Sequence, residues 1–563
     1  MKKKSFRLSG IPVLILAGLT LLLMGSCASD PGTQSGEHNI PHLKERNGVI
    51  QLYVEDEPFI VLGGELRNSS SSNLEFMKPI WGRMKELNVN TMILPVAWQQ
   101  FEPVEDEFDY SLVDGLIQDA RKYDRRLVFL WFGAWKNGMS GYNPAWVSSD
   151  IERFPRMKYE NGEKIEVLSN LSENLLEAEQ KAFFLFMERI AEIDSEENTV
   201  IMVQVENEVG IRGSTRDFSD LANEKFEADV PSELMDYLEE NRDILQPVVG
   251  EAWKSNGYKT SGTWEEIFDK GMLADEIFMA WSYSTYINAV AEAGKKAYDL
   301  PMFANTWLHT EGRVAGIYPS GGPVATMLDI WDAGAPDIAF LAPDIYEAEF
   351  KFKCEQFLHN GNPLFIPEAC AIWYDDTVSG PAKAYYSIAN HNAIGFSPFG
   401  IDDRVYHPNH PIKKAYGILE SMMPMIVKAQ QEDRIQGFME EGNAFDSVYF
   451  GDYKFLVDYS YQKPDYMEGY GFILQVSEDE FIISGNGMTI QVSSEDPGKP
   501  NLSFLLIEEG EFIDGIWHQT RVLSGDETLN NGTDGIKFPP NPYDIGRIGL
   551  NDISVQKIKV FLH

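Results

Sequence analysis

The chain is short of basic residues, cysteine and histidine, and each shortage argues against a class of protein. Its 563 residues hold 47 Lys and Arg against 87 Asp and Glu, a formal net charge of −40. A nucleic-acid-binding protein needs a basic surface to replace the counterions of phosphates, so this charge argues against that class. Three cysteines and nine histidines cannot build a disulfide framework or a closed thiolate zinc site. The composition is still that of a folded protein, since 44% of the residues are hydrophobic and 12% aromatic.

The first 26 residues have the layout of a signal peptide. A basic start, with Lys2, Lys3, Lys4 and Arg7, precedes the apolar run Ile11–Met24. As a helix this run is too short to cross about 30 Å of hydrocarbon comfortably, so it suits a signal peptide better than a membrane span.

The end of this segment resembles the lipobox of bacterial lipoproteins, because small residues stand directly before Cys27 in Leu-Met-Gly-Ser-Cys. The resemblance implies that Cys27 is diacylated, becomes the mature N-terminus and anchors the protein in a membrane. The protein would then be exported and associated with the outer membrane, facing either the periplasm or the outside. An ordinary secretory signal with an incidental cysteine is the alternative. Residues 27–48, which are polar and without apolar periodicity, are expected to form a flexible tether.

From about residue 50, short apolar runs of strand length alternate with helical periodicity. Helices are expected around Phe76–Leu87, Leu112–Ala120 and Ala182–Ile190, a loop with short helices at 209–275, and one long helix at 276–298. The eight expected strands are Ile60–Leu66, Thr91–Trp98, Leu127–Trp135, Val200–Glu208, Pro301–Trp307, Ile338–Tyr346, Pro363–Cys370 and Ala393–Ile401.

Strands that are apolar throughout and separated by helices indicate a parallel sheet covered on both faces. Eight of them suit a (β/α)8 TIM barrel, an α/β fold, with insertions, and we assign it residues 49–430. The competitor, an open doubly wound sheet, usually carries a glycine-rich phosphate-binding turn after its first strand. Here Gly63 and Gly64 are followed by Glu65 and Leu66, without that motif. Residues 431–563 have short alternating runs and many turn residues, which predict a smaller all-β domain, sandwich-like in form.

The chemistry of a (β/α)8 barrel lies at the C-terminal ends of its strands. The side chains expected there are rich in carboxylates and aromatic rings. Such a set suits neutral sugars, because carboxylates accept hydroxyl hydrogen bonds and indole rings stack on sugar faces. In strand order the candidates are Glu65 and Arg67; Trp98 and Glu102; Trp131 and Trp135; Asn207 and Glu208; Asn305 and Trp307; Asp344 and Tyr346; Glu368 and Trp373; and Asp402 and Asp403.

The segment Gln-Val-Glu-Asn-Glu at 204–208 resembles the Asn-Glu signature that ends strand four in the clan-A retaining glycoside hydrolases. Further similarity to the β-galactosidases of glycoside hydrolase families 35 and 42 lies at 63–67, 98–110 and 143–146. It covers about residues 50–425. The C-terminal part resembles an uncharacterised domain of family-35-like bacterial enzymes.

By position, the resemblance implies that Glu208 is the general acid/base, that Glu368 is the nucleophile, and that Asn207 binds the sugar 2-hydroxyl. The segment Ile-Pro-Glu-Ala-Cys around Glu368 departs from the usual Ser-Glu-aromatic form. Glu206 shares a strand face with Glu208 but lies one layer deeper, so a structural role is expected for it. Tyr346 is placed to hydrogen-bond Glu368 and to hold it ionised.

The other candidates keep two interpretations each. Trp98, Trp131, Trp135 and Trp373 fit the barrel core as well as a sugar platform, and Glu65 and Glu102 fit a rim ion pair as well as a ligand contact. We name as substrate-binding candidates Asn207, Glu65, Trp98, Glu102, Trp135, Asn305, Tyr346 and Trp373. The His407–His410 segment has a metal-like spacing, but Pro408 favours a solvated loop. Cys354 and Cys370 could form a disulfide or remain free.

The resulting hypothesis is a retaining, exo-acting β-galactosidase that acts on oligosaccharides or polysaccharides, without a cofactor or a metal. One alternative keeps the mechanism and changes the sugar to an arabinoside, fucoside, xyloside or glucoside. Another is a surface lipoprotein that binds glycans without cleaving them. The oligomeric state cannot be derived from the sequence.

Overall fold

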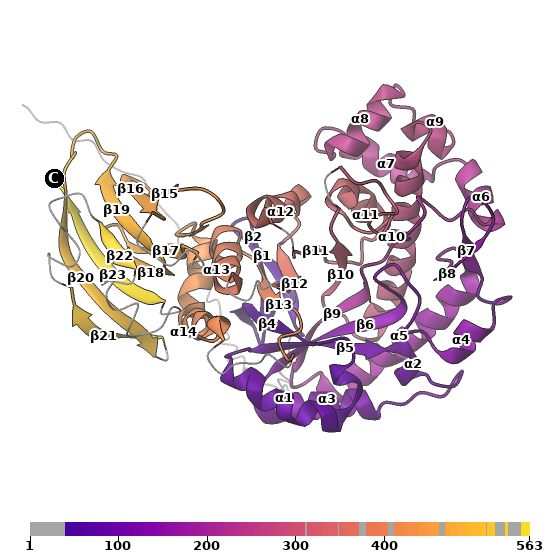
Figure 1. The fold of residues 1–563 in the computed structure, drawn as a ribbon, viewed down its shortest axis with the longest axis horizontal. Coiled ribbons are helices and arrows are strands. Elements are labelled where there is room, and N and C mark those ends of the chain that lie inside the picture. Colours follow the sequence, from indigo (N-terminus) through magenta and orange to yellow (C-terminus); the bar gives the residue numbers. More distant parts are fainter. Residues whose placement is uncertain are drawn as a thin grey trace, which may run out of the picture. The chain divides into compact units, whose positions relative to one another are not determined.

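The computed structural model describes residues 40–563 apart from 310–311, 347, 371–378, 404–409, 461–467, 514, 524–534 and 539–552. The chain divides into a unit at Met1–His38 and a unit at Asn39–His563, and all that follows concerns the second (Figure 1). Cys27, Trp373 and His407–Asn409 lie outside the described residues, as does the expected signal peptide. Among the helices that the structure describes, none has the length and apolarity to span a membrane.

Eight parallel strands form the barrel that the sequence predicts (Figure 1). In space they follow the order β11-β10-β9-β6-β5-β4-β13-β12. The ring closes between β11 and β12, where the Ile345 N–H donates to the Glu368 carbonyl at 2.9 Å. In chain order the strands are β4 (Val61–Glu65), β5 (Thr91–Ala97), β6 (Arg126–Lys136), β9 (Val200–Asn207), β10 (Met302–Trp307), β11 (Phe340–Asp344), β12 (Phe365–Ala369) and β13 (Gly395–Pro398).

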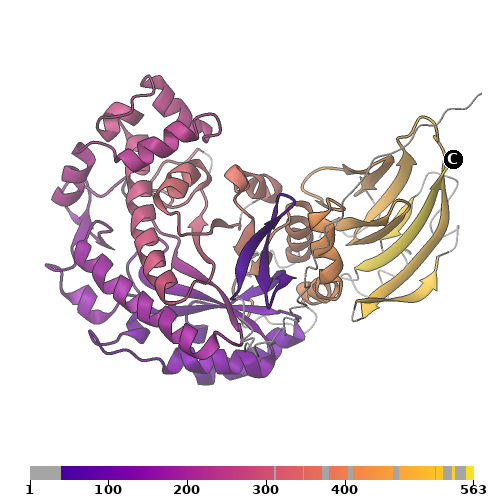
Figure 2. The same cartoon turned by 180° about the vertical axis from the view of Figure 1, so that it is seen from behind.

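Helices cover the outer face of the barrel, so its strands are buried on both sides and their sequences are continuously apolar. The predicted helices are present, and 272–297 form one helix, α10. It packs alongside α5, as both views of the ribbon show (Figures 1 and 2). The covering helices are α1 (Leu74–Glu86), α3 (Ser111–Tyr123), α5 (Glu173–Asp194), α10 (Met272–Ala297), α11 (Leu328–Gly334), α12 (Phe350–Gln356), α13 (Gly380–Asn390) and α14 (Pro411–Gln431).

Insertions lengthen the connections before several of these helices, mainly around β9. The short helices expected at 209–275 are present between β9 and α10. The inserted elements are α2 (Trp98–Phe101), α4 (Ala145–Ser149), β7 (Arg156–Lys158), β8 (Lys164–Leu168), α6 (Asp220–Glu227), α7 (Ser232–Glu240), α8 (Pro247–Ser255) and α9 (Trp264–Phe268).

A small antiparallel sheet precedes the barrel, with strands β1 (His42–Arg46), β2 (Val49–Val54) and β3 (Glu57–Phe59). Leu52 and Val54 of β2 belong to the same buried cluster as inward-facing residues of the barrel strands. The flexible tether expected over residues 27–48 is therefore wrong for its last part, because 42–46 already pair as a strand. Its mostly polar sequence hid this strand, since three of its five residues are exposed and none is fully buried.

The described residues between 435 and 562 form the all-β part that the sequence predicts. Two antiparallel sheets, of order β14-β17-β18-β23-β20-β21 and β15-β16-β19-β22, enclose a common apolar core. The strands are β14 (Ile435–Met439), β15 (Phe445–Phe450), β16 (Tyr453–Asp458), β17 (Tyr470–Ser477), β18 (Glu480–Asn486), β19 (Met488–Ser494), β20 (Leu502–Ile513), β21 (Ile516–Val522), β22 (Ile536–Phe538) and β23 (Ser554–Leu562).

The barrel and the β part share buried surface through α13. The Tyr385 ring contacts Phe472 of β17 with ring centroids 5.2 Å apart, and its hydroxyl lies 3.1 Å from the Ser484 hydroxyl of β18. Phe472 belongs to the same hydrophobic cluster as the barrel helices. Cys354 and Cys370 are both buried and do not form a disulfide with each other, which decides between the two alternatives that the sequence left open.

Candidate active site

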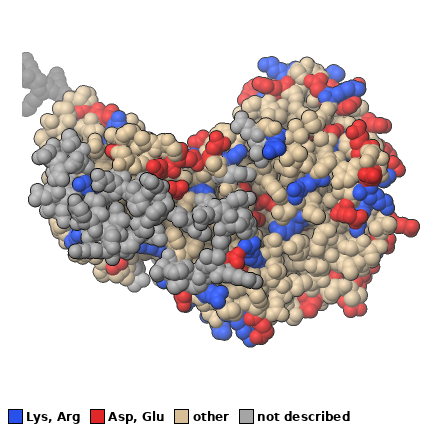
Figure 3. All heavy atoms as spheres, viewed as in Figure 1, with Lys and Arg blue, Asp and Glu red and all other residues tan. Residues whose placement is uncertain are grey.

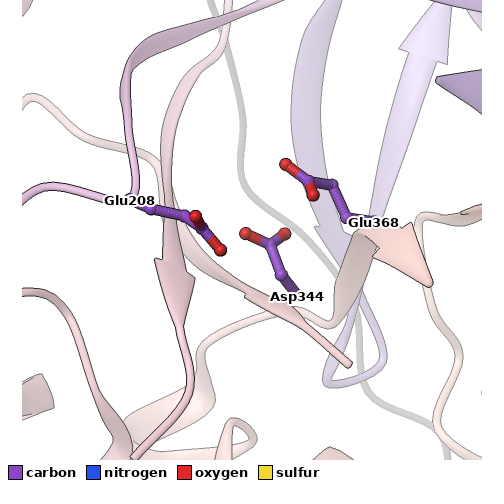
Figure 4. Close-up of side chains that lie close together, drawn as sticks. All are labelled: Glu208, Asp344 and Glu368. Carbon is purple, nitrogen blue, oxygen red and sulfur yellow. The ribbon is translucent and has the colours of Figure 1, made fainter. Parts of the chain in front are cut away.

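Three carboxyl groups meet at the C-terminal ends of the barrel strands (Figure 4). Glu208 directly follows β9, Asp344 ends β11 and Glu368 lies in β12. One carboxylate oxygen from each lies within 4.8 Å of the other two, and all three side chains are buried. The structure thus brings together the two glutamates that the sequence singled out and places Asp344 between them.

Asn305 and Tyr346 fix the positions of these carboxyl groups. The Asn305 Oδ1 accepts a hydrogen bond from the Glu208 backbone N–H at 2.9 Å. Its Nδ2 lies 2.7 Å from Asp344 Oδ2 and 3.4 Å from Glu368 Oε1. The hydrogen bond expected from Tyr346 is present, with its hydroxyl 2.5 Å from Glu368 Oε2. Glu368 therefore accepts hydrogen bonds at both oxygens, which hold its carboxyl group in place.

Burial and mutual repulsion raise the pKa of two of the three groups. The pKa of Glu208 rises to about 8, first because the group is buried and then because of the negative charge of Glu368. Lys136, a hydrogen bond with Asp344 and the charge of Arg212 oppose this rise. Burial, followed by the charge of Glu368, also raises the pKa of Asp344 well above its usual value. At neutral pH Glu208 is thus protonated and able to donate a proton.

Glu65, at the end of β4, is a fourth buried carboxyl group of this site. Its pKa is raised well above the usual value, first by burial and then by the charge of Glu368. Among the described residues, neither Glu65 oxygen has a hydrogen-bond partner, and the same holds for Asn207 Nδ2 and Asp344 Oδ1. Buried polar atoms are almost always paired in folded proteins, so these atoms are available to a polar ligand.

The three carboxyl groups at 208, 344 and 368 are also the one set of acidic, histidine or cysteine side chains, within the described ranges, spaced to hold a cation. Hard divalent cations prefer such oxygen ligands. No other described group suits a metal.

Other sequence candidates are bonded within the core of the barrel. Trp98 is fully buried and its Nε1–H donates to Glu102 Oε2 at 2.8 Å. The other Glu102 oxygen accepts from the Asp106 N–H at 2.9 Å. Trp135 donates to the Leu168 carbonyl at 3.0 Å. Sugar contacts by Trp98, Glu102 and Trp135 remain predictions. For the two tryptophans these partners favour the core alternative, whereas Glu102 accepts hydrogen bonds from Trp98 and Asp106 and its two alternatives stay open.

The remaining rim residues pair with one another. Arg67 forms an ion pair with Asp403, and its backbone N–H donates to Asp402 Oδ1 at 3.0 Å. Trp131 donates to Glu179 Oε1 at 3.0 Å and packs against Phe183 and Phe186 of α5. Trp307, at the end of β10, lies under the guanidinium of Arg212.

Lys136 is the residue of this site that the sequence analysis missed. It ends β6, its side chain is buried, and its Nζ donates to Asn207 Oδ1. The expected strand stopped one residue earlier, at Trp135, because a lysine does not continue an apolar run. The sequence signal that could have identified it is a lysine directly after the apolar run of a barrel strand.

Two family models match separate parts of the chain, one in the barrel and one mainly in the β part. Residues 71–270 match the family model of glycoside hydrolase family 42, described as "Beta-galactosidase". The match supports a glycoside hydrolase and includes Lys136, Asn207 and Glu208. Residues 412–532 match a domain of unknown function, DUF5597. Among curated proteins no sequence matches the chain.

The solved structures that the chain matches include β-galactosidases, among them the following two. The one from Bacillus circulans sp. alkalophilus is 14% identical, with a TM-score of 0.46 over 65% of this chain and 57% of that one. The one from Rahnella sp. R3 is 14% identical, with a TM-score of 0.44 over 65% and 56%. The catalytic domain of β-amylase from Paenibacillus polymyxa is 14% identical, with a TM-score of 0.44 over 63% and 98%. The chain thus spans little more than half of either galactosidase.

Proposed function

We propose that the barrel is a retaining, exo-acting glycoside hydrolase, with Glu208 as acid/base and Glu368 as nucleophile, and that its substrate is a β-galactoside of an oligosaccharide or polysaccharide. The observation that carries the proposal is the pair itself. One carboxyl oxygen of Glu208 lies within 4.8 Å of one carboxyl oxygen of Glu368. The pKa of Glu208 is raised to about 8, and the carboxyl group of Glu368 accepts hydrogen bonds from Tyr346 and Asn305. Retaining glycosidases hold their carboxyl groups about 5–5.5 Å apart, whereas inverting enzymes need about 6.5–9.5 Å to admit a water.

The reaction then has two steps. In the first, a Glu368 oxygen bonds to the anomeric carbon as the glycosidic bond breaks, and the Glu208 proton goes to the departing oxygen. In the second, the Glu208 carboxylate takes a proton from water, and the water oxygen bonds to the anomeric carbon. The bond to Glu368 breaks, Glu368 recovers its charge, and the free sugar leaves with its original configuration.

A panel of aryl glycosides tests this function and its alternatives together. We expect hydrolysis of the aryl β-galactoside, and Glu208→Gln and Glu368→Gln should each abolish it. Preference for an arabinoside, fucoside, xyloside or glucoside would keep the mechanism and change the substrate. A protein that binds oligosaccharide but releases no monosaccharide would be a glycan-binding lipoprotein. Full activity after treatment with a chelator would exclude a catalytic cation at the three carboxyl groups.

The location is a separate part of the proposal and rests on the lipobox-like sequence at Cys27. A diacylated Cys27 would tether the enzyme to the outer membrane, where a neutral glycan would be its partner. Cys27→Ala should move the protein from the membrane fraction to the soluble fraction after cell lysis. Retention in the membrane fraction would contradict the lipid anchor.

A further inference from the structure

The end of β6 departs from regular pairing in a way that places Lys136. Trp131 pairs with Val205 and Lys136 pairs with Asn207, so β6 accommodates four residues where β9 has one. That one residue is Glu206. Bulges of this kind occur beside active sites, where they redirect a side chain.

The carboxyl group of Glu206 holds this bulge together. It accepts hydrogen bonds from the backbone N–H groups of Gly133 at 3.2 Å, Ala134 at 2.5 Å and Trp135 at 3.0 Å. At Gly133 a Cβ atom would lie 2.0 Å from Glu179 Oε1 and 2.5 Å from Glu206 Oε1, so no side chain fits there. The bulge is therefore a specifically built feature, and the residue that follows it is Lys136.

The contact between Lys136 and Asn207 settles which way the amide points. An ammonium group has only donors, so it bonds Oδ1 and not Nδ2 of an asparagine. The Lys136 Nζ donates to Asn207 Oδ1 and lies 4.6 Å from the centre of the Phe132 ring. The Asn207 Nδ2, which is buried and has no partner among the described residues, is thereby left to donate to a ligand.

Lys136 is also the buried cation among the carboxyl groups of the site. Its charge acts on both Glu65 and Glu208 and favours their ionised forms. Around Glu208 the other charged groups are Glu65, Asp344, Glu368 and Arg212. Around Glu65 they are Glu208, Asp344, Glu368 and Asp402.

We infer that Lys136 is a positioning residue for the hydrolysis: it orients the Asn207 amide toward the sugar and supplies the buried positive charge beside Glu65 and Glu208. This inference rests on the proposed glycosidase function. A hydrogen bond from Asn207 that strengthens in the transition state would act on kcat more than on KM. Lys136 thus serves the same step as Glu208 without touching the sugar itself.

Two substitutions separate the two contributions of Lys136. Lys136→Met removes both the charge and the donor, whereas Lys136→Gln removes the charge and keeps an N–H donor for Asn207. Lys136→Met should lower kcat on the order of 10- to 100-fold, the range for losing a charged hydrogen bond, with a small change in KM. Lys136→Gln should lower kcat less. Lys78→Met, at an exposed position of α1, is the matched control and should leave both constants unchanged.

The pH profile of kcat/KM is the readout that would stay unchanged if Lys136 had only a structural role. Because Lys136 lowers the pKa of Glu208, both charge-removing variants should shift the alkaline limb of kcat/KM to higher pH. An unmoved limb in a folded variant overturns the inference, whether or not kcat falls. Should Lys136→Met not fold, the same measurements on Lys136→Gln decide.

The experiments distinguish a failure of the proposed glycosidase function from a failure of the inference about Lys136. If the wild type hydrolyses no aryl glycoside, the glycosidase proposal fails. The electrostatic part is then tested by carbon NMR titration of Glu208, with its signal assigned by Glu208→Gln. A higher pKa of Glu208 in Lys136→Met supports the inference, and an unchanged one overturns it.

Discussion

At the scale of single residues, the site gives two chemically identical side chains, those of Glu208 and Glu368, different surroundings. Glu208 donates its backbone N–H to Asn305 Oδ1 and has a carboxyl group with a raised pKa, whereas the carboxyl group of Glu368 accepts hydrogen bonds from Tyr346 and Asn305. A pair of carboxyl groups with different surroundings is what an acid and a nucleophile require. On the face that Figure 3 shows, other acidic side chains lie scattered over the surface among basic ones.

The first prediction concerns the alkaline limb of activity. Only protonated Glu208 can protonate the leaving group, so kcat/KM should fall as the pH rises through about 8. A substrate whose leaving group needs no protonation, such as a dinitrophenyl glycoside, is the control. Its glycosylation step should show a much weaker alkaline loss. An equal loss for both substrates would assign the limb to another group.

At the scale of elements, the bulge of β6 depends on a glycine. Gly133→Ala should destabilise the protein by about 1–3 kcal/mol or more, the range for overpacking a closed site, because its Cβ would overlap Glu179 and Glu206. Gly82→Ala in α1 is the control, since nothing lies within 4 Å of a Cβ there. It should stabilise the helix by up to about 1 kcal/mol. Denaturant unfolding measures both, and equal stabilities would show that the bulge tolerates a side chain.

The same elements show what the sequence could and could not predict. Buried strands such as Thr91–Ala97 and helices such as Leu74–Glu86 follow from apolar runs and periodicity, because packing against the barrel imposes both. Because the strands of the barrel are parallel, residues at their C-terminal ends, such as Glu208 and Glu368, lie at the same end of the barrel. The bulge of β6 could not be predicted, because it depends on a contact with Glu206 in another strand. Lys136 was missed because the apolar run, and with it the expected strand, stops at Trp135.

At the scale of the whole molecule, the barrel and the β part should unfold together. Phe472 of β17 is fully buried in the cluster that contains the barrel helices, against Tyr385 of α13. Phe472→Ala should cost about 3–5 kcal/mol, as for other buried phenylalanines. It should lower the temperatures of unfolding and of activity loss together. Calorimetry that resolves a separate, unchanged barrel transition would contradict a shared core.

The measurement that tests the central claim most directly is the configuration of the sugar as it is released. Proton NMR can follow the anomeric signal during hydrolysis of an aryl β-galactoside, before mutarotation mixes the anomers. The pairing of Glu208 and Glu368, with oxygens within 4.8 Å, predicts that the β anomer appears first, by double displacement. Initial release of the α anomer would show inversion and contradict the assignment of Glu368 as the nucleophile.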